Sequence, residues 1–120
     1  MYIMDWKVAV VPTDTVYGLV CRVDDKDSID RIYEIKGRDR SKPLILFGKS
    51  KAVLREYTDG WFNKVDSLAH CYWPGPLTII LPRTNKIPEF VNPGFDSIGL
   101  RVPASKTVMK LLEDVPEGCF

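Results

Sequence analysis

Long hydrophobic runs are missing from this sequence of 120 residues. The two longest apolar stretches, Val8–Val11 and Leu77–Leu81, are far shorter than the roughly 20 residues that a membrane-spanning helix needs. The N-terminus has neither the basic segment nor the small-residue cleavage site of a secretory signal peptide. We therefore expect a cytoplasmic protein with no membrane partner.

Histidine and cysteine are scarce as well. The only histidine is His70, and the three cysteines, Cys21, Cys71 and Cys119, include no C-x-x-C pair. An odd number of cysteines argues against a disulfide framework, and soft ligands are too few for a transition-metal site. We expect reduced thiols in the core, His70 on a helix surface, and no metal ligated by the protein.

An excess of charge of one sign is also nearly absent, because 17 Lys and Arg against 16 Asp and Glu leave a net charge of +1. Overall charge therefore gives no general attraction for nucleic acid. Hydrophobic residues make up 45% and charged residues 28%, which is an ordinary globular composition. We predict a single domain over 1–120, in which any anion binding comes from local clusters of cations.

Turn residues divide the chain into alternating strands and helices. Strands are predicted at 7–11, 17–21, 43–47, 77–81 and 98–102, each a short apolar run bounded by Pro, Gly or charged residues. Helices are predicted from the acidic cluster at 24–27 to Gly37, from Ser50 to about Tyr57, from Asp59 to W-P-G-P at 73–76, and after Ser105. The alternation predicts an α/β or α+β fold with one mixed sheet.

The segment Lys36–Pro43, K-G-R-D-R-S-K-P, places four cations against one acid. It covers the end of a predicted helix and the loop behind it. In such a loop, Arg can make bidentate contacts with a phosphate group and Lys supplies a point charge. The alternative is a solvated loop whose cations complement the helix C-terminus. Spacing alone does not decide between the two.

Two other segments are candidates for ligand contacts. P-T-D-T at 12–15 follows a buried strand, where α/β sheets bind ligands, although Thr13 and Asp14 also suit an ordinary turn. Arg101 stands within an apolar strand, so it requires an anion, either a protein carboxylate or a ligand. We interpret W-P-G-P at 73–76 as a rigid structural turn, and the acids at 24–27 as helix capping because they lack the Gly and Glu of a calcium loop.

Four motifs, in the order P-T-D-T-V-Y-G-L, K-G-R-D-R-S-K-P-L, W-P-G-P-L-T and I-G-L-R-V-P, resemble the YrdC-like family of threonylcarbamoyl-AMP synthases. They extend from Pro12 to Pro103. The resemblance implies a twisted mixed sheet with flanking helices around a basic concave cavity. It also implies that L-threonine, bicarbonate and ATP form threonylcarbamoyl-AMP and pyrophosphate, toward N6-threonylcarbamoyladenosine at position 37 of tRNA.

The resemblance also implies roles for individual residues. Catalytic roles would fall to Lys36 and Arg38, ATP binding to Arg38, Lys42 and Ser97, threonine binding to Thr15 and Arg101, and a wall of the pocket to Tyr17. The implied partners are Mg²⁺ with ATP, proteins that transfer the threonylcarbamoyl group onward, and tRNA or double-stranded RNA.

The sequence departs from the family pattern in three places. Few residues precede the first predicted strand, where the family usually carries a helix. Relatives continue with a Ser-x-Asn motif about where this chain stops at Phe120, so the resemblance implies a domain incomplete at its C-terminus, either as a fragment of a longer protein or as a degenerate copy. Some relatives have a threonine-contacting histidine where this chain has Phe47. Two alternatives stay open: a non-catalytic RNA-binding module of the same fold, and the related carbamoyltransferase-type domain of hydrogenase maturation, whose acylphosphatase-like and zinc-finger modules are not in this sequence.

Overall fold

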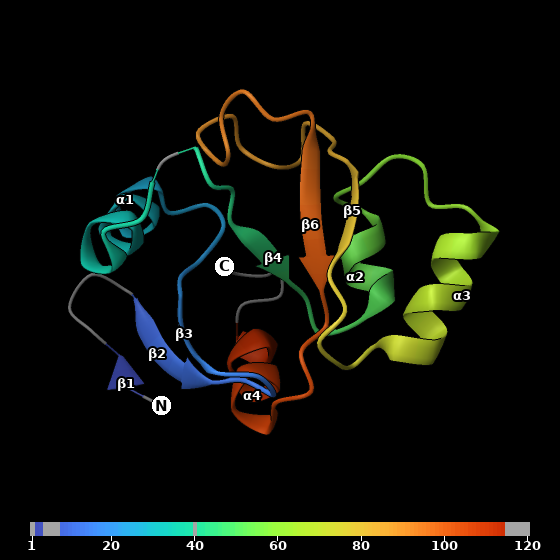
Figure 1. Cartoon of the computed structure of the whole chain (residues 1–120), viewed down its shortest axis with the longest axis horizontal. Helices are drawn as coiled ribbons and strands as arrows, with labels where there is room; N and C mark the ends of the chain where they lie inside the picture. The colour runs from blue at the N-terminus through green and yellow to red at the C-terminus, as the bar shows by residue number, and fades with distance from the viewer. Residues whose placement is uncertain (1, 4–7, 40, 115–120) are drawn as a thin grey trace.

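The computed structural model describes residues 2–3, 8–39 and 41–114, in which strands and helices alternate (Figure 1). The first sheet has the order β1 (Tyr2–Ile3), β2 (Ala9–Pro12) and β3 (Tyr17–Val20), with antiparallel neighbours. The combination of these strands with helices confirms the predicted α/β class. Pro12, expected just beyond the strand, is the last residue of β2 and pairs with Tyr17.

The second sheet is mixed. Its order is β4 (Ile45–Phe47), β6 (Ser97–Arg101) and β5 (Ile79–Pro82), with β4 parallel and β5 antiparallel to β6. One mixed sheet was predicted, whereas the described strands form two sheets because β3 and β4 do not pair with each other. Strand ends elsewhere differ from the predictions by one or two residues.

Helix α1 (Lys26–Lys36) begins and ends as predicted from local signals, and helix α2 (Lys51–Arg55) begins as predicted after Ser50 but ends before the predicted Tyr57. The Asp25 side chain accepts a hydrogen bond from the Ser28 amide, and Gly37 ends α1 in the left-handed region at φ 58°. Ser50 caps α2 in the same manner. The capping interpretation of the acidic cluster is therefore confirmed for Asp25.

Helix α3 (Asn63–Tyr72) begins later than predicted. Asp59 does not cap it, because the N-cap position of α3 is Phe62. The Asp59 amide donates to the Pro82 carbonyl at 3.0 Å and holds this stretch against the end of β5. The W-P-G-P turn ends α3 as predicted. Val65 and Ala69 of α3 are buried, whereas Phe62, which precedes the helix, and Tyr72 at its end are exposed.

The second sheet has a core face and an open face. Alternate residues such as Leu46, Ile98 and Leu100 are buried in the main core together with residues of α1, α2 and α3. The intervening residues point to the other side, which we call the open face. The open face carries Ile45, Phe47, Ile80, Ser97, Gly99 and Arg101. A smaller cluster packs α4 (Lys106–Asp114) on the first sheet.

The scarce residue types lie mostly as expected. Cys21 is buried, as predicted, and His70 is exposed on α3. The prediction for Cys71 is wrong, since this thiol lies on the exposed side of α3, and Cys119 is outside the described residues. No helix in the described ranges is long and apolar enough to cross a membrane.

Candidate functional site

Arg101, the last residue of β6, is 8% exposed and is held from three sides. Its Nε donates to the Gly75 carbonyl at 2.9 Å, and its Nη2 forms an ion pair with the carboxylate of Asp14. Its Cζ lies 5.7 Å from the centre of the Phe47 ring, in a cation–π arrangement. The anion that the sequence required for this buried charge is therefore supplied by a protein carboxylate.

Asp14 reaches Arg101 from the turn between β2 and β3. The Thr13 hydroxyl accepts hydrogen bonds from the amides of Thr15 and Val16, both at 3.2 Å, which keeps the turn compact. The Ser105 hydroxyl donates to the Pro12 carbonyl at 2.6 Å and ties the same hairpin to the start of α4. Thr13 thus behaves as in an ordinary turn, while Asp14 makes a contact 87 residues away.

The W-P-G-P turn supplies the second partner of Arg101. The Gly75 amide donates to the Val102 carbonyl at 2.8 Å, and the Trp73 indole donates to the Leu77 carbonyl at 2.8 Å. A Cβ on Gly75 would lie 2.4 Å from the Tyr72 carbonyl oxygen, so only glycine fits. The turn is structural, as predicted, and it also orients Arg101. Three of the four sequence motifs therefore meet at one guanidinium.

The fourth motif forms the loop that follows α1, which we call the basic loop (37–43). Arg38 is half-buried, and its Nη2 donates to the Pro43 carbonyl at 2.9 Å, so the guanidinium contacts its own loop. The Tyr33 hydroxyl donates to the Lys42 carbonyl at 2.9 Å. A hydrogen bond from the Ser41 amide lowers the pKa of Asp39. Arg40 lies outside the described residues.

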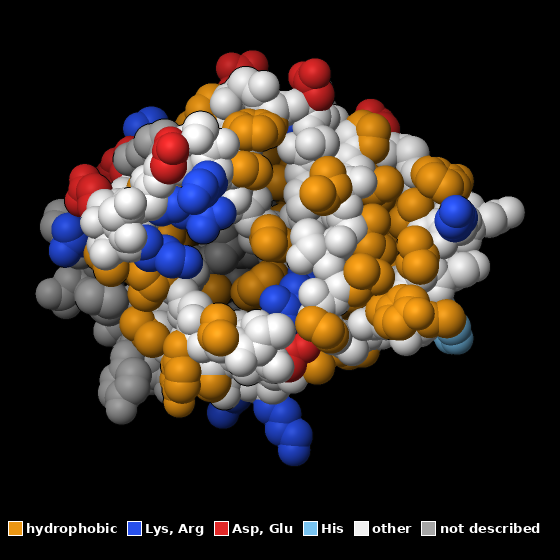
Figure 2. All heavy atoms as spheres, in the orientation of Figure 1, with side chains coloured by type: hydrophobic (Ala, Val, Ile, Leu, Met, Phe, Trp, Pro, Cys, Tyr) orange, Lys and Arg blue, Asp and Glu red, His pale blue; other side chains and the backbone are white. Residues whose placement is uncertain are grey.

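The basic loop and Arg101 lie at opposite ends of the open face. Strands β4 and β6 run parallel, with Ile45 beside Gly99 and Phe47 beside Arg101, so the loop before β4 lies at the Ser97 end of β6 (Figure 1). Ser97 and Arg101 share a face and are four residues apart, a separation of about 13 Å at roughly 3.3 Å per residue. Figure 2 shows Lys and Arg side chains gathered along a hollow in this surface.

The middle of the open face is apolar. Ile45, Gly99 and Ile80 form one row across the three strands, and Ile80 is 69% exposed. A Cβ on Gly99 would be 3.2 Å from Cγ2 of Thr78 and 3.5 Å from Cγ1 of Ile45, so a larger residue at this position would crowd both neighbours. The arrangement offers a guanidinium for a carboxylate at one end, cations for phosphates at the other, and an apolar floor between them.

Several predicted site residues make no described contact with Arg101. Lys36 and Lys42 are exposed, and Ser97 is half-buried at the start of β6. The Thr15 hydroxyl is exposed and lies 3.1 Å from the Thr13 hydroxyl, while Tyr17 is 73% exposed on β3. Their roles stay predictions.

Sequence reasoning missed two residues of the site, Asp14 as the partner of Arg101 and Gly75 as its carbonyl acceptor. A signal existed for Asp14, because a buried arginine needs an anion and Asp14 is the single acid in its motif. For Gly75 no comparable signal exists, since any residue carries a carbonyl group.

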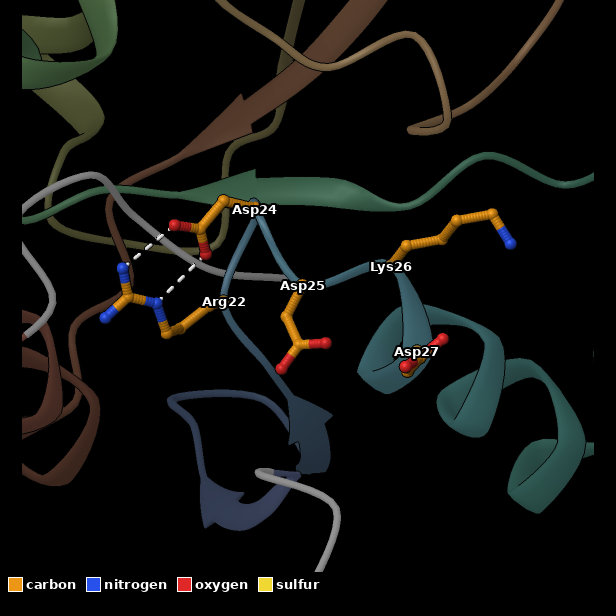
Figure 3. A pocket seen from close by; sticks show the side chains of 5 residues that line it. All are labelled: Arg22, Asp24, Asp25, Lys26 and Asp27. Atoms are coloured by element: carbon orange, nitrogen blue, oxygen red, sulfur yellow. Dashed lines mark hydrogen bonds and ion pairs between the residues drawn. The ribbon is translucent and has the colours of Figure 1, made fainter.

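The acidic segment after β3 lies in a separate shallow pocket (Figure 3). Arg22 donates from Nε and Nη2 to the two carboxylate oxygens of Asp24, at 3.0 and 2.9 Å. Asp25 caps α1, and Lys26 points away from the other side chains drawn. Within the described part of the chain, no three His, Cys, Asp or Glu side chains are grouped to hold a metal ion.

Comparisons with known proteins agree on one family. The family model Sua5_yciO_yrdC, described as "Telomere recombination", matches residues 2–117. A threonylcarbamoyl-AMP synthase of Pyrococcus abyssi is 36% identical over 112 residues, which are 93% of this chain and 33% of that protein. One of Vibrio parahaemolyticus is 36% identical over 107 residues, 88% of this chain and 58% of that protein.

A solved structure extends the likeness to three dimensions. The crystal structure of P. abyssi Sua5 complexed with L-threonine superposes with a TM-score of 0.88 at 34% identity, over 98% of this chain and 35% of that one. The chain thus spans between about a third and three fifths of the length of these relatives.

Proposed function

Because the chain belongs to the Sua5/YciO/YrdC family, we propose that it forms threonylcarbamoyl-AMP and pyrophosphate from L-threonine, bicarbonate and ATP. The product would serve N6-threonylcarbamoyladenosine formation at position 37 of tRNA, through proteins that transfer the threonylcarbamoyl group. The observation that carries the proposal is the buried Arg101 guanidinium, where three family motifs meet at the far end of the open face from the basic loop. The names of the synthase relatives and the L-threonine complex of P. abyssi Sua5 support it.

The Arg101 end is assigned to threonine. A guanidinium has five N–H donors, and the described contacts of Arg101 use Nε and Nη2. Nη1 is therefore the group that we assign to the threonine carboxylate, in a charge-assisted hydrogen bond. Thr15, next to Asp14 in the turn, would contact the same substrate, and Tyr17 would form a wall of the pocket. Since Asp14 already pairs with Arg101, the cation is in place before threonine arrives.

The basic-loop end is assigned to ATP. Arg38 and Lys42 would bind the phosphates, with Lys36 adding to the positive field, and Ser97 would contact the nucleotide at the same end of β6. Mg²⁺ would arrive with ATP, as part of the substrate. Arg38 would exchange its hydrogen bond to the Pro43 carbonyl for stronger, charge-assisted bonds to a phosphate oxygen.

The proposed reaction requires the substrates to be positioned and the negative charge of the phosphates to be neutralised. It involves no covalent enzyme intermediate. The neutral threonine nitrogen attacks the carbon of CO₂ or bicarbonate and forms the N–C bond of a carbamate. A proton leaves when CO₂ reacts, and a water molecule leaves instead when bicarbonate reacts. A carbamate oxygen then attacks the α-phosphorus as the bond to the bridging oxygen of the β-phosphate breaks, and pyrophosphate leaves with that electron pair. Arg101 would orient the attacking group, while the basic loop offsets charge on the leaving group.

Pyrophosphate release from ATP, measured with and without L-threonine and bicarbonate, tests the proposal. Release that requires both is the expected result, and release independent of threonine contradicts it. Release that depends on carbamoyl phosphate instead would favour the carbamoyltransferase-type domain. RNA affinity that falls steeply with salt and ignores threonine, in a chain that releases no pyrophosphate, would favour an RNA-binding module.

A further inference from the structure

The segment between β5 and β6 forms hydrogen bonds with Leu44, the residue that directly follows the basic loop. Asn92 is 4% exposed, and its Oδ1 accepts a hydrogen bond from the Leu44 amide at 2.9 Å. Its Nδ2 donates to the Leu44 carbonyl at 2.9 Å. One carboxamide therefore satisfies both backbone groups of a buried residue, as a neighbouring strand would do.

Asparagine suits this place for two reasons. Its φ of 46° lies in the left-handed region, which Asn tolerates better than most residues. Its side chain also offers one acceptor and two N–H donors in a plane, whereas an ionised aspartate offers acceptors alone. An aspartate at this position would keep the bond from the Leu44 amide and set its second oxygen against the Leu44 carbonyl.

Arg83 holds the backbone that carries Asn92. Its Nη1 donates to the Val91 carbonyl at 2.7 Å and to the Asn92 carbonyl at 3.1 Å, and its Nη2 donates to the Pro88 carbonyl at 2.9 Å. The two terminal nitrogens of the guanidinium thus donate to different carbonyls at once. A lysine ammonium, which has a single nitrogen, cannot replace this arrangement. Arg83 thus shapes the segment so that the Asn92 side chain faces Leu44.

Leu44 follows Lys42 and Pro43 directly, so this anchor fixes the C-terminal end of the basic loop. The other fixed points of the loop come from its own side, where Tyr33 and Arg38 bind the carbonyls of Lys42 and Pro43. We infer that Asn92, held by Arg83, is a positioning residue that sets the cations of the basic loop in place for nucleotide phosphates. The anchoring is independent of the substrate, whereas its effect on ATP rests on the proposed function.

The test compares Asn92→Ala and Asn92→Asp with Asn85→Ala, a control in the same segment whose side chain is exposed. Hydrogen exchange reports on the Leu44 amide and on the basic loop, and calorimetry measures the Kd of MgATP and of L-threonine. For Asn92→Ala we expect faster exchange at Leu44 and a roughly tenfold weaker MgATP Kd, which corresponds to about 1.4 kcal/mol. The threonine Kd should stay within about twofold, because Arg101 has its own partners.

The two other variants sharpen the result. Asn92→Asp keeps the bond from the Leu44 amide but sets a buried carboxylate oxygen against the Leu44 carbonyl, so it should weaken MgATP binding at least as much as Asn92→Ala does. Asn85→Ala should match wild type. Equal weakening of MgATP and threonine in Asn92→Ala would indicate general damage and overturn the inference, as would faster exchange at Leu44 with an unchanged MgATP Kd.

The proposed function can fail separately. If the wild-type chain binds no MgATP, the nucleotide assignment of the basic loop is refuted. Exchange at the Leu44 amide then still decides the anchor: faster exchange confined to Leu44 and the basic loop supports it, and unchanged exchange in Asn92→Ala refutes it.

Discussion

The two ends of the open face hold their cations in different ways. At one end, Arg101 is buried, and its partners Gly75 and Asp14 come from segments remote in sequence. At the other end, Arg38 bonds to a carbonyl of its own loop, and Lys42 is exposed. A buried guanidinium with remote partners keeps its geometry without a ligand, whereas exposed cations on a loop stay screened by water.

This difference suits the two proposed substrates. A single carboxylate is small, so it benefits from one oriented donor that is in place beforehand. A triphosphate is large and highly charged, so it can be bound by several exposed cations on a loop whose backbone is anchored at Leu44. Stability should therefore depend on the Arg101 end, and nucleotide affinity on the basic-loop end.

Removing Arg101 should have the largest effect. Arg101→Met leaves the Asp14 carboxylate, 15% exposed as a side chain, without its cation, which should lower the free energy of unfolding by roughly 3 kcal/mol. Urea denaturation measures this loss. The double variant Asp14→Asn/Arg101→Met, which removes both charges, should lose clearly less. If the single and double variants lose the same amount, the ion pair is not what stabilises this end.

Gly75→Ala comes next. Its Cβ would overlap the Tyr72 carbonyl, so the turn must shift and carry the acceptor of Arg101 with it, at a cost of about 2 kcal/mol. We expect the threonine Kd to rise while the MgATP Kd stays near that of wild type. Gly18→Ala is the matched control, because its Cβ would meet Cγ2 of Thr13 at an ordinary 3.9 Å. Equal effects of the two substitutions would show that the turn does not set the geometry of Arg101.

Local signals in the sequence were enough for much of the fold. Asp25 and Gly37 delimit α1 through bonds within a few residues, and the W-P-G-P turn ends α3. Asp59 shows the limit of this reasoning. It is a good capping residue by type, but α3 begins only at Asn63, and the Asp59 amide donates to the Pro82 carbonyl in a tertiary contact at the end of β5.

The candidate site was predictable where chemistry imposes a requirement. A charge in an apolar strand demanded an anion for Arg101, and the structure supplies one. Which acid pairs with Arg101 depends on how the β2–β3 turn packs against β6. No local sequence pattern predicts that tertiary contact. Asn92 was missed for the same reason, because its segment reads only as a proline-rich loop and its partner Leu44 is 48 residues away.

Lys42→Ala tests the basic-loop end and should barely change stability. Substituting an exposed lysine should change the free energy of unfolding by no more than about 0.5 kcal/mol, while loss of one phosphate contact should weaken MgATP binding about tenfold. Urea denaturation and calorimetry measure the two effects.

Raising the salt concentration should weaken MgATP binding strongly and threonine binding little, since the Debye length falls from about 10 Å at 0.1 M to about 3 Å at 1 M. Calorimetry at both salt concentrations decides the point. If salt changes the Kd of MgATP and the Kd of L-threonine equally, the two ends of the open face do not differ in how solvent screens their cations.

The smallest effect concerns Asp39 and appears only in acid. The Ser41 amide lowers the pKa of the Asp39 carboxyl from its ordinary 3.8, so the charged form stabilises the folded loop above that pH. This contribution should be lost as the pH falls through the lowered pKa. Asp39→Asn keeps an oxygen that can accept the Ser41 amide and removes the charge, so its difference from wild type in unfolding free energy should shrink between pH 5 and pH 2.5. A difference that stays constant with pH would show that the Asp39 charge does not stabilise the folded basic loop.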